Sequence, residues 1–245
     1  MRSLIAPLLL AGIWAAPAPA QAGSHQHHHH QHHKHQAPEQ QRPSPIPDGA
    51  GHGHGHGHGD HSHDVGPAGS TYDLRWLDAM VQHHTGALRM SEIVFNIGSP
   101  GVGALATEIW REQAREIRAM GLWRRAWFPE APVYPVALQP GGDPNTMAGL
   151  QRMSAAQIEA MRMMGEPPSR DNRVVWFLEG MLAHHGGALE MAHDALEKST
   201  NTTVRRLARE IIVAQRREII ALRRMLRHEG LDKPEYHKFD SLFTF

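Results

Sequence analysis

The pattern M-x-x-H-H-x-G-A-L-x-M occurs twice in this chain, and no other feature restricts its fold as strongly. The first copy spans residues 80–90 and the second spans residues 181–191. A Gln-x-x-Glu-Ile segment follows each copy, beginning at Gln113 and at Gln215. Repetition of a unit of this size is typical of a duplicated supersecondary element. The sequence therefore predicts two similar hairpins, each made of two helices joined by a turn.

The His and Met residues of each copy fall on one face of the expected helix. At about 100° per residue, Met80, His83 and Met90 lie within a stripe roughly 80° wide, with His84 at its edge. Imidazole and thioether groups together suit Cu(I), and imidazole also binds Cu(II) or Zn(II). A single such residue is more often ordinary core, but the repetition in register favours a metal site. The candidate ligands are Met80, His83, His84, Met90, Met181, His184, His185 and Met191.

Each copy also places a glycine in the middle of its helix. A glycine there costs about 1 kcal/mol relative to alanine. Gly86 and Gly187 therefore predict either the close approach of a neighbouring helix or access for an ion.

The two motif helices, with the Gln-x-x-Glu-Ile helices that follow them, resemble domain-of-unknown-function family 305 over residues from about 71 to 228. Its characterised members look like the CopM-type periplasmic copper-binding proteins. The resemblance implies a ferritin-like four-helix bundle, export, and binding of copper or silver, and it implies no catalytic activity. This chain departs from the family pattern in having no acidic residue shortly before the Phe177-Leu178 pair.

Residues 1–22 are typical of a secretory signal, with Arg2 at the start, an apolar run up to Trp14 and small residues before Ala22. This run is too short to span a bilayer, and no later segment reaches about 20 apolar residues. We therefore expect a periplasmic or secreted protein without membrane insertion. Because the chain has no cysteine, a copper site in it must use Met and His.

Residues 23–70 are expected to be a disordered, His-rich, metal-binding arm, because almost nothing in them can be buried. Flexible imidazoles collect Cu(II), Zn(II) and Ni(II) without selecting among them. If the signal is cleaved after Ala22, the new terminus Gly23-Ser24-His25 can also form a square-planar Cu(II) chelate. The candidate ligands of the arm are His25, His27, His28, His29, His30, His52, His54, His56 and His58.

Residues 71–245 are expected to form one all-α domain, a ferritin-like four-helix bundle. We predict long helices over about 71–97, 102–127, 171–199 and 201–228. Residues 128–170 would form the crossover between the hairpins, with a capping box at Ser154 and Gln157 starting a short helix. The aromatic tail that begins at Tyr236 either lies along the bundle or docks on a partner.

Three other features carry alternatives. The arginines of the last helix are interleaved with Glu, which favours a solvated face over a nucleic-acid site. The crossover methionines can pack as core or form a secondary Cu(I) site. A di-iron oxidase needs a Glu-x-x-His motif on each of two helices, whereas only the motif from Glu190 to His193 is present. The crossover methionines are Met147, Met153, Met161, Met163 and Met164.

The sequence thus predicts an exported protein that sequesters or carries copper and is not an enzyme. Cu(I) would bind in the bundle and Cu(II) in the arm, with silver, zinc or nickel as further ions. Its partners would be metal ions and an unidentified metal-exchange protein, and not nucleic acid. The alternative is a zinc or nickel buffer in which the arm dominates and the His pairs are structural.

Overall fold

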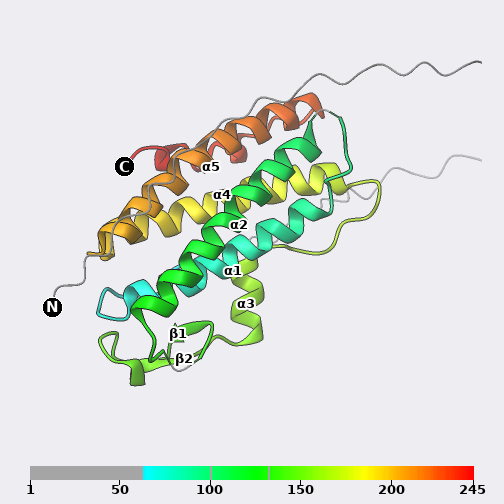
Figure 1. Ribbon diagram of the computed structural model, residues 1–245. Coiled ribbons are helices and arrows are strands. Elements are labelled where there is room, and N and C mark those ends of the chain that lie inside the picture. The colour runs from blue at the N-terminus through cyan, green and yellow to red at the C-terminus, as the bar shows by residue number, and fades with distance from the viewer. Residues whose placement is uncertain (1–62, 100, 132) are drawn as a thin grey trace, which may run out of the picture. The chain divides into compact units, whose positions relative to one another are not determined.

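Two helical hairpins pack together into a four-helix bundle in the computed structural model (Figure 1). The structure describes residues 63–245 except 100 and 132. In the first hairpin, α1 (Tyr72–Glu92) packs against α2 (Val102–Trp127), and in the second α4 (Arg173–Lys198) packs against α5 (Thr202–His228). The two motif helices, α1 and α4, also pack against each other. The predicted helical bundle of two duplicated hairpins is confirmed. The predicted signal peptide and the predicted arm ligands lie outside the described residues.

The start and the buried face of α5 follow directly from its sequence. The Asn201 side chain accepts hydrogen bonds from the backbone N–H groups of Thr203 and Val204, so it caps the helix. Apolar residues such as Ile211 recur at helical spacing and are fully buried. Several arginines lie on the opposite, exposed face, where Arg206 pairs with Glu210 one turn on. This arrangement agrees with a solvated basic face.

The first motif helix ends earlier than the sequence suggested, at Glu92 and not near residue 97. The N–H of Val94 bonds to the carbonyl of Ser91, and the N–H of Ile97 bonds to that of Val94, so the chain tightens into turns. Gly103 then packs against the Phe95 and Ile97 carbonyls; a Cβ at Gly103 would lie 2.4 Å from the first. Close packing at this corner stops the helix.

The crossover contains a small antiparallel sheet that the sequence analysis did not predict. Strand β1 (Val136–Leu138) pairs with β2 (Leu150–Arg152), and the one-turn helix η1 (Met147–Gly149) precedes β2. The Asp78 carboxylate of α1 accepts a hydrogen bond from the Val136 N–H at 2.9 Å, which ties the sheet to the bundle. These strands are too short for a hydrophobic alternation to be visible among the Pro and Gly residues around them.

The short helix α3 (Ala155–Arg162) follows the sheet and crosses the long helices steeply (Figure 1). Its predicted capping box is present, since the side chains of Ser154 and Gln157 each accept from the other's backbone N–H. Met163 is the C-cap that follows the last residue of the helix. Its φ of 50° is in the left-handed region, which residues other than glycine rarely adopt. The Arg162 guanidinium donates to the Gln82 side chain of α1 at 3.0 Å. The end of α3 is therefore fixed against α1.

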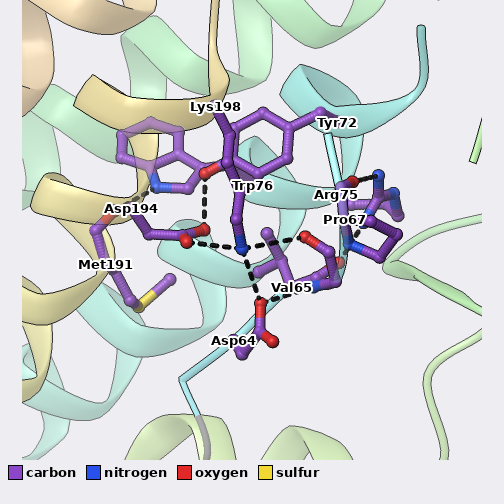
Figure 2. A network of polar contacts seen from close by, with 10 residues as sticks. Asp64, Val65, Pro67, Tyr72, Arg75, Trp76, Met191, Asp194 and Lys198 are labelled. Carbon is purple, nitrogen blue, oxygen red and sulfur yellow. Dashed lines mark hydrogen bonds and ion pairs between the residues drawn. The ribbon is translucent and has the colours of Figure 1, made fainter. Parts of the chain in front are cut away.

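Residues 63–70, here called the strap, lie against the bundle, although we expected the arm to extend to residue 70. The Arg75 guanidinium donates to the carbonyls of Val65 and Pro67. Lys198 of α4 binds both Asp64 and Asp194, as Figure 2 shows. The strap is thus held by charged hydrogen bonds from two helices, which composition alone does not reveal.

The C-terminal tail lies along the bundle, where it forms the 3-10 helices η2 (Pro234–His237) and η3 (Asp240–Leu242). The Phe239 ring packs on α4 at Gly186, where a Cβ would lie 2.0 Å from it. Tyr236 donates to Glu179, and Arg223 of α5 pairs with Asp240. Of the two expectations for the tail, the structure shows packing on the bundle. Within the described residues, no helix has the length and apolarity needed to cross a membrane.

Candidate metal centre

The inner histidines of the two motifs meet at the contact between α1 and α4. The rings of His83 and His184 have centroids 3.8 Å apart, and neither side chain is exposed at all. The His184 Nε2–H donates to the backbone carbonyl of His83 at 3.0 Å. The repeat thus brings one imidazole from each copy to a shared position in the core.

The outer histidines turn toward the second helix of their own hairpin. His84 Nε2 lies 2.6 Å from a carboxylate oxygen of Glu116 on α2. His185 Nε2 lies 2.7 Å from a carboxylate oxygen of Glu218 on α5, a close contact without good hydrogen-bond alignment. Both glutamates belong to the repeated Gln-x-x-Glu-Ile segments, whose role the sequence did not reveal. A carboxylate that holds one ring nitrogen of a histidine orients the other nitrogen toward a ligand.

The four imidazoles share an unusual feature, since each is fully buried with a nitrogen that has no hydrogen-bond partner among the described residues. The Nδ1 atoms of all four lack one, and so do the Nε2 atoms of His83 and His185. A buried polar group left unsatisfied costs about 1–3 kcal/mol, and most native ones have a partner. Such a cluster calls for an explanation beyond packing. The four are His83, His84, His184 and His185.

Burial also sets the protonation of the inner pair. Desolvation, together with the neighbouring imidazoles, holds the pKa of His83 and of His184 well below its ordinary value of 6.5. Both rings are therefore neutral near pH 7, the form that binds metal ions.

Each outer histidine has one carboxylate partner, and a third carboxyl group lies near those two partners. Besides Glu116 and Glu218, Glu112 lies on α2, and burial followed by the charge of Glu218 raises its pKa. A group of carboxylates at the edge of a buried imidazole cluster favours a cation there.

The four motif methionines all lie in the core. Met80, Met90 and Met181 are fully buried and Met191 nearly so, which places them within the packed bundle as the helical stripe predicts. Across residues 63–245 as described, no three His, Asp or Glu side chains are arranged to hold one metal ion. A metal site built from the described residues would therefore combine fewer than three of these side chains with another donor, such as thioether sulfur.

The motif glycines have different neighbours, which come from the end of α3 and, at Gly187, also from the strap. A Cβ at Gly86 would lie 1.9 Å from the carbonyl oxygen of Arg162. A Cβ at Gly187 would lie 2.6 Å from His63 Nε2 and 3.0 Å from the sulfur of Met163. Close approach is thus the reason for both glycines, although the approaching groups belong to the crossover and the strap.

Two residues beside this cluster were not among the predicted ligands of the bundle. His63 Nε2 lies 2.8 Å from the Met163 sulfur, and the His63 ring is 5.6 Å from that of His83. In the sequence, His63 is the last histidine of a His-rich run and Met163 is one of several crossover methionines. No periodicity links them, so only the fold brings them together.

The only Glu-x-x-His motif of the chain does not face one site. Glu190 lies 3.3 Å from His63 Nδ1, whereas the His193 Nε2–H donates to the Leu242 carbonyl at 3.0 Å. The two side chains therefore have separate neighbours, in the strap and in the tail.

Comparison with known proteins identifies the family of the chain. The model of the family described as "Domain of unknown function (DUF305)" matches residues 73–226. The chain belongs to the DUF305 family. No curated protein matches this DUF305 chain.

Solved structures similar to this DUF305 protein include CopM and another family member. CopM in its Cu(II)-bound form is 23% identical, over 64% of this chain and 96% of that chain, with a TM-score of 0.48. CopM in its apo form gives the same identity and coverage, with a TM-score of 0.46. A DUF305 fragment from Deinococcus radiodurans is 28% identical, over 66% of this chain and 99% of that chain, with a TM-score of 0.45.

Proposed function

We propose that this DUF305 protein is an exported copper-binding protein that sequesters or carries copper, and that it is a binding protein and not an enzyme. The observation that carries the proposal is the group of four buried imidazoles with unpartnered nitrogens. Leaving these groups unsatisfied is costly, and an ion that binds one or two of them together with thioether sulfur offsets part of that cost.

The chemistry of the donors favours copper over harder ions. Neutral imidazole and thioether suit Cu(I), whereas Mg²⁺ and Ca²⁺ prefer oxygen ligands. His83 and His184 supply neutral imidazoles. Met80 and Met181 are buried on the same helical stripes as these histidines and supply thioether sulfur. Silver(I) would use the same donors. Cu(II) would bind in the arm, and the export of the protein rests on the signal-like residues 1–22.

The alternative function is a zinc or nickel buffer in which the arm binds the ions. The 21 histidines of the chain, most of them in residues 23–62, support this alternative, because imidazole binds all of these ions. In this alternative the bundle imidazoles bind no ion, so their unpartnered nitrogens remain unexplained.

A Cu(I) titration of three proteins separates the two functions. They are the mature chain, a chain lacking residues 23–62, and a mature His83→Leu/His184→Leu variant. The deletion spares His63, which lies against the bundle. Under anaerobic conditions, competition with a chromogenic Cu(I) chelator measures the bound copper and its affinity.

We expect the chain without the arm to retain at least one tight Cu(I) site that the His83→Leu/His184→Leu variant lacks. A His228→Leu variant serves as the control, because His228 is exposed at the end of α5. If the deletion alone removes all copper binding, the bundle proposal is wrong and the arm accounts for the function.

A further inference from the structure

His63 and Met163 present a second pair of soft donors outside the four-imidazole cluster. The imidazole comes from the strap and the thioether from the end of α3, and their Nε2 and Sδ atoms lie 2.8 Å apart. His63 is only 9% exposed. The Glu190 carboxylate lies 3.3 Å from the other ring nitrogen, where it can hold the Nδ1 proton and leave the Nε2 lone pair toward the sulfur.

The backbone at Met163 is unusual in a way that favours a specific role for its side chain. Its φ of 50° lies in the left-handed region, which costs a residue with a Cβ about 1 kcal/mol or more. Glycine is the common residue at this position of a helix end, and the chain has one two residues later, at Gly165. The methionine thus occupies a strained position where its sulfur faces His63.

The facing helix leaves room for this pair. At Gly187 a side chain would meet both His63 Nε2 and the Met163 sulfur. The second motif therefore has its glycine at the point where the imidazole and the thioether approach α4.

A cavity reaches the His63 member of this pair. It has a volume of about 450 Å³ and lies between the strap, β1 and α3. Pro140, Gly141 and Gln157 line its exposed rim, and the buried residues His63 and Met153 line its inner part, with Met161 on the wall. Arg75 also lines the cavity, but its guanidinium group already donates hydrogen bonds to strap carbonyls and to the Thr71 hydroxyl. Two further thioethers thus flank the approach to His63.

We propose that His63 and Met163 form an entry site for soft monovalent ions, which pass through this cavity and are handed on to His83 and His184. The His63 ring stands at 74° to the His83 ring with centroids 5.6 Å apart, and the His83 ring lies 3.8 Å from that of His184. Each step is a ligand exchange between neighbouring imidazoles. The proposal rests on the proposed copper-binding function and adds the route and its first ligands.

Bridging by an ion requires a small movement. Typical metal–nitrogen and metal–sulfur lengths of about 2.0 and 2.3 Å put the two donor atoms about 3.6 Å apart on one ion. The His63 and Met163 atoms must therefore separate from 2.8 Å by under about 1 Å. His63 lies near the start of the strap, where a side-chain rotation provides this.

Methionine-methyl NMR with Ag(I) tests the entry site in the full mature chain. Residues 23–62 contain no methionine, so the ¹³C-methyl signals of labelled Met report the bundle and crossover without interference from the arm. We expect the Met163 methyl signal to shift on addition of Ag(I), and the shift to be lost in a His63→Gln variant. Ring signals of His83 and His184 in the same samples report the proposed function separately. Met225 of α5 is the internal control, because it is likewise partly buried against the core and is not among the candidate ligands.

If the His83 and His184 rings respond to Ag(I) and the Met163 methyl does not, the entry site is wrong while the copper-binding proposal stands. If neither responds, the copper-binding proposal itself fails.

Stopped-flow transfer of Cu(I) from a coloured chelator complex tests the hand-over. The phase that is missing in the His83→Leu/His184→Leu variant reports loading of the inner pair. We expect Met163→Leu to slow this phase several-fold without reducing its final amplitude, and Met225→Leu on α5 to leave the rate unchanged. Because leucine keeps the size of the side chain and removes only the sulfur, the fold should be retained. An unchanged rate in Met163→Leu would overturn the route.

Discussion

The His83 and His184 rings lie 3.8 Å apart in the core although the residues are 101 positions apart in the chain. The contact forms because α1 and α4 carry the same motif and pack against each other. Nothing in the described part of the chain accepts or donates a hydrogen bond at either His83 ring nitrogen. The pair is therefore unfavourable for the stability of the metal-free fold and requires compensation elsewhere.

Replacing His83 by leucine should stabilise the metal-free protein. Leucine has a similar volume and removes two unpartnered polar atoms, so the free energy of unfolding should rise by about 1 kcal/mol or more. The same variant should lose the rise in melting temperature that Cu(I) or Ag(I) gives the wild type. Calorimetry with and without metal measures both effects. A destabilised metal-free variant would mean that the imidazole is a satisfied part of the core.

Stability of the metal-free protein should fall as the pH drops below about 6.5. The pKa of His83 and of His184 is held well below 6.5 by burial in the folded state, while the unfolded chain titrates near that value. The unfolded state then binds more protons, which favours unfolding. Above pH 6.5 the effect vanishes because both states are neutral.

Urea midpoints at about pH 7.5 and about pH 5.5 test this. The loss should be smaller in the His83→Leu/His184→Leu variant, and the difference between the two proteins isolates the contribution of the pair from that of the carboxylates. Equal losses in both proteins would contradict the prediction.

Removing the charge of Glu116 should weaken metal binding without unfolding the bundle. Its carboxylate lies 2.6 Å from His84 Nε2, and loss of a partner that orients a ligating imidazole typically costs 10- to 100-fold in affinity. We expect Glu116→Gln to lower Cu(I) affinity by about tenfold. Glu108→Gln, on an exposed position of the same helix, should leave the affinity unchanged in the same chelator competition.

Adding one methyl group at Gly86 should destabilise the fold. Its Cβ would lie 1.9 Å from the backbone carbonyl of Arg162, so the end of α3 must move, at a cost of about 1–3 kcal/mol. Gly121→Ala on α2 is a matched control, because its nearest neighbour is a flexible arginine tip at 3.7 Å. That change should stabilise the helix by up to about 1 kcal/mol. Thermal unfolding of the two variants should thus shift in opposite directions.

The repeat made the bundle predictable. Helical periodicity located α2 at its observed bounds, Val102–Trp127, and the duplicated motif favoured two similar motif helices facing each other near the core, but which of their histidines meet was visible only in the fold. The small sheet at Val136–Leu138 was not predictable, because its strands have only three residues each and pairing across a turn-rich loop leaves no periodic pattern.

The same limit applies to the site. Glu116 and Glu218 were visible as repeated positions, but only the fold shows that they contact His84 and His185. His63 was hidden among the histidines of a low-complexity segment. Its position depends on bonds from Arg75 and Lys198 to the strap, which are long-range contacts without a local signal.

The end of α3 covers both motif glycines with two consecutive residues, the Arg162 carbonyl at Gly86 and the Met163 side chain at Gly187. Because these atoms belong to adjacent residues, a displacement of the end of α3 that uncovers Gly86 also removes the Met163 sulfur from Gly187, where His63 of the strap still lies. Full access to Gly187 from this side therefore also requires movement of the strap, so the two copies of the motif are uncovered by different sets of motions.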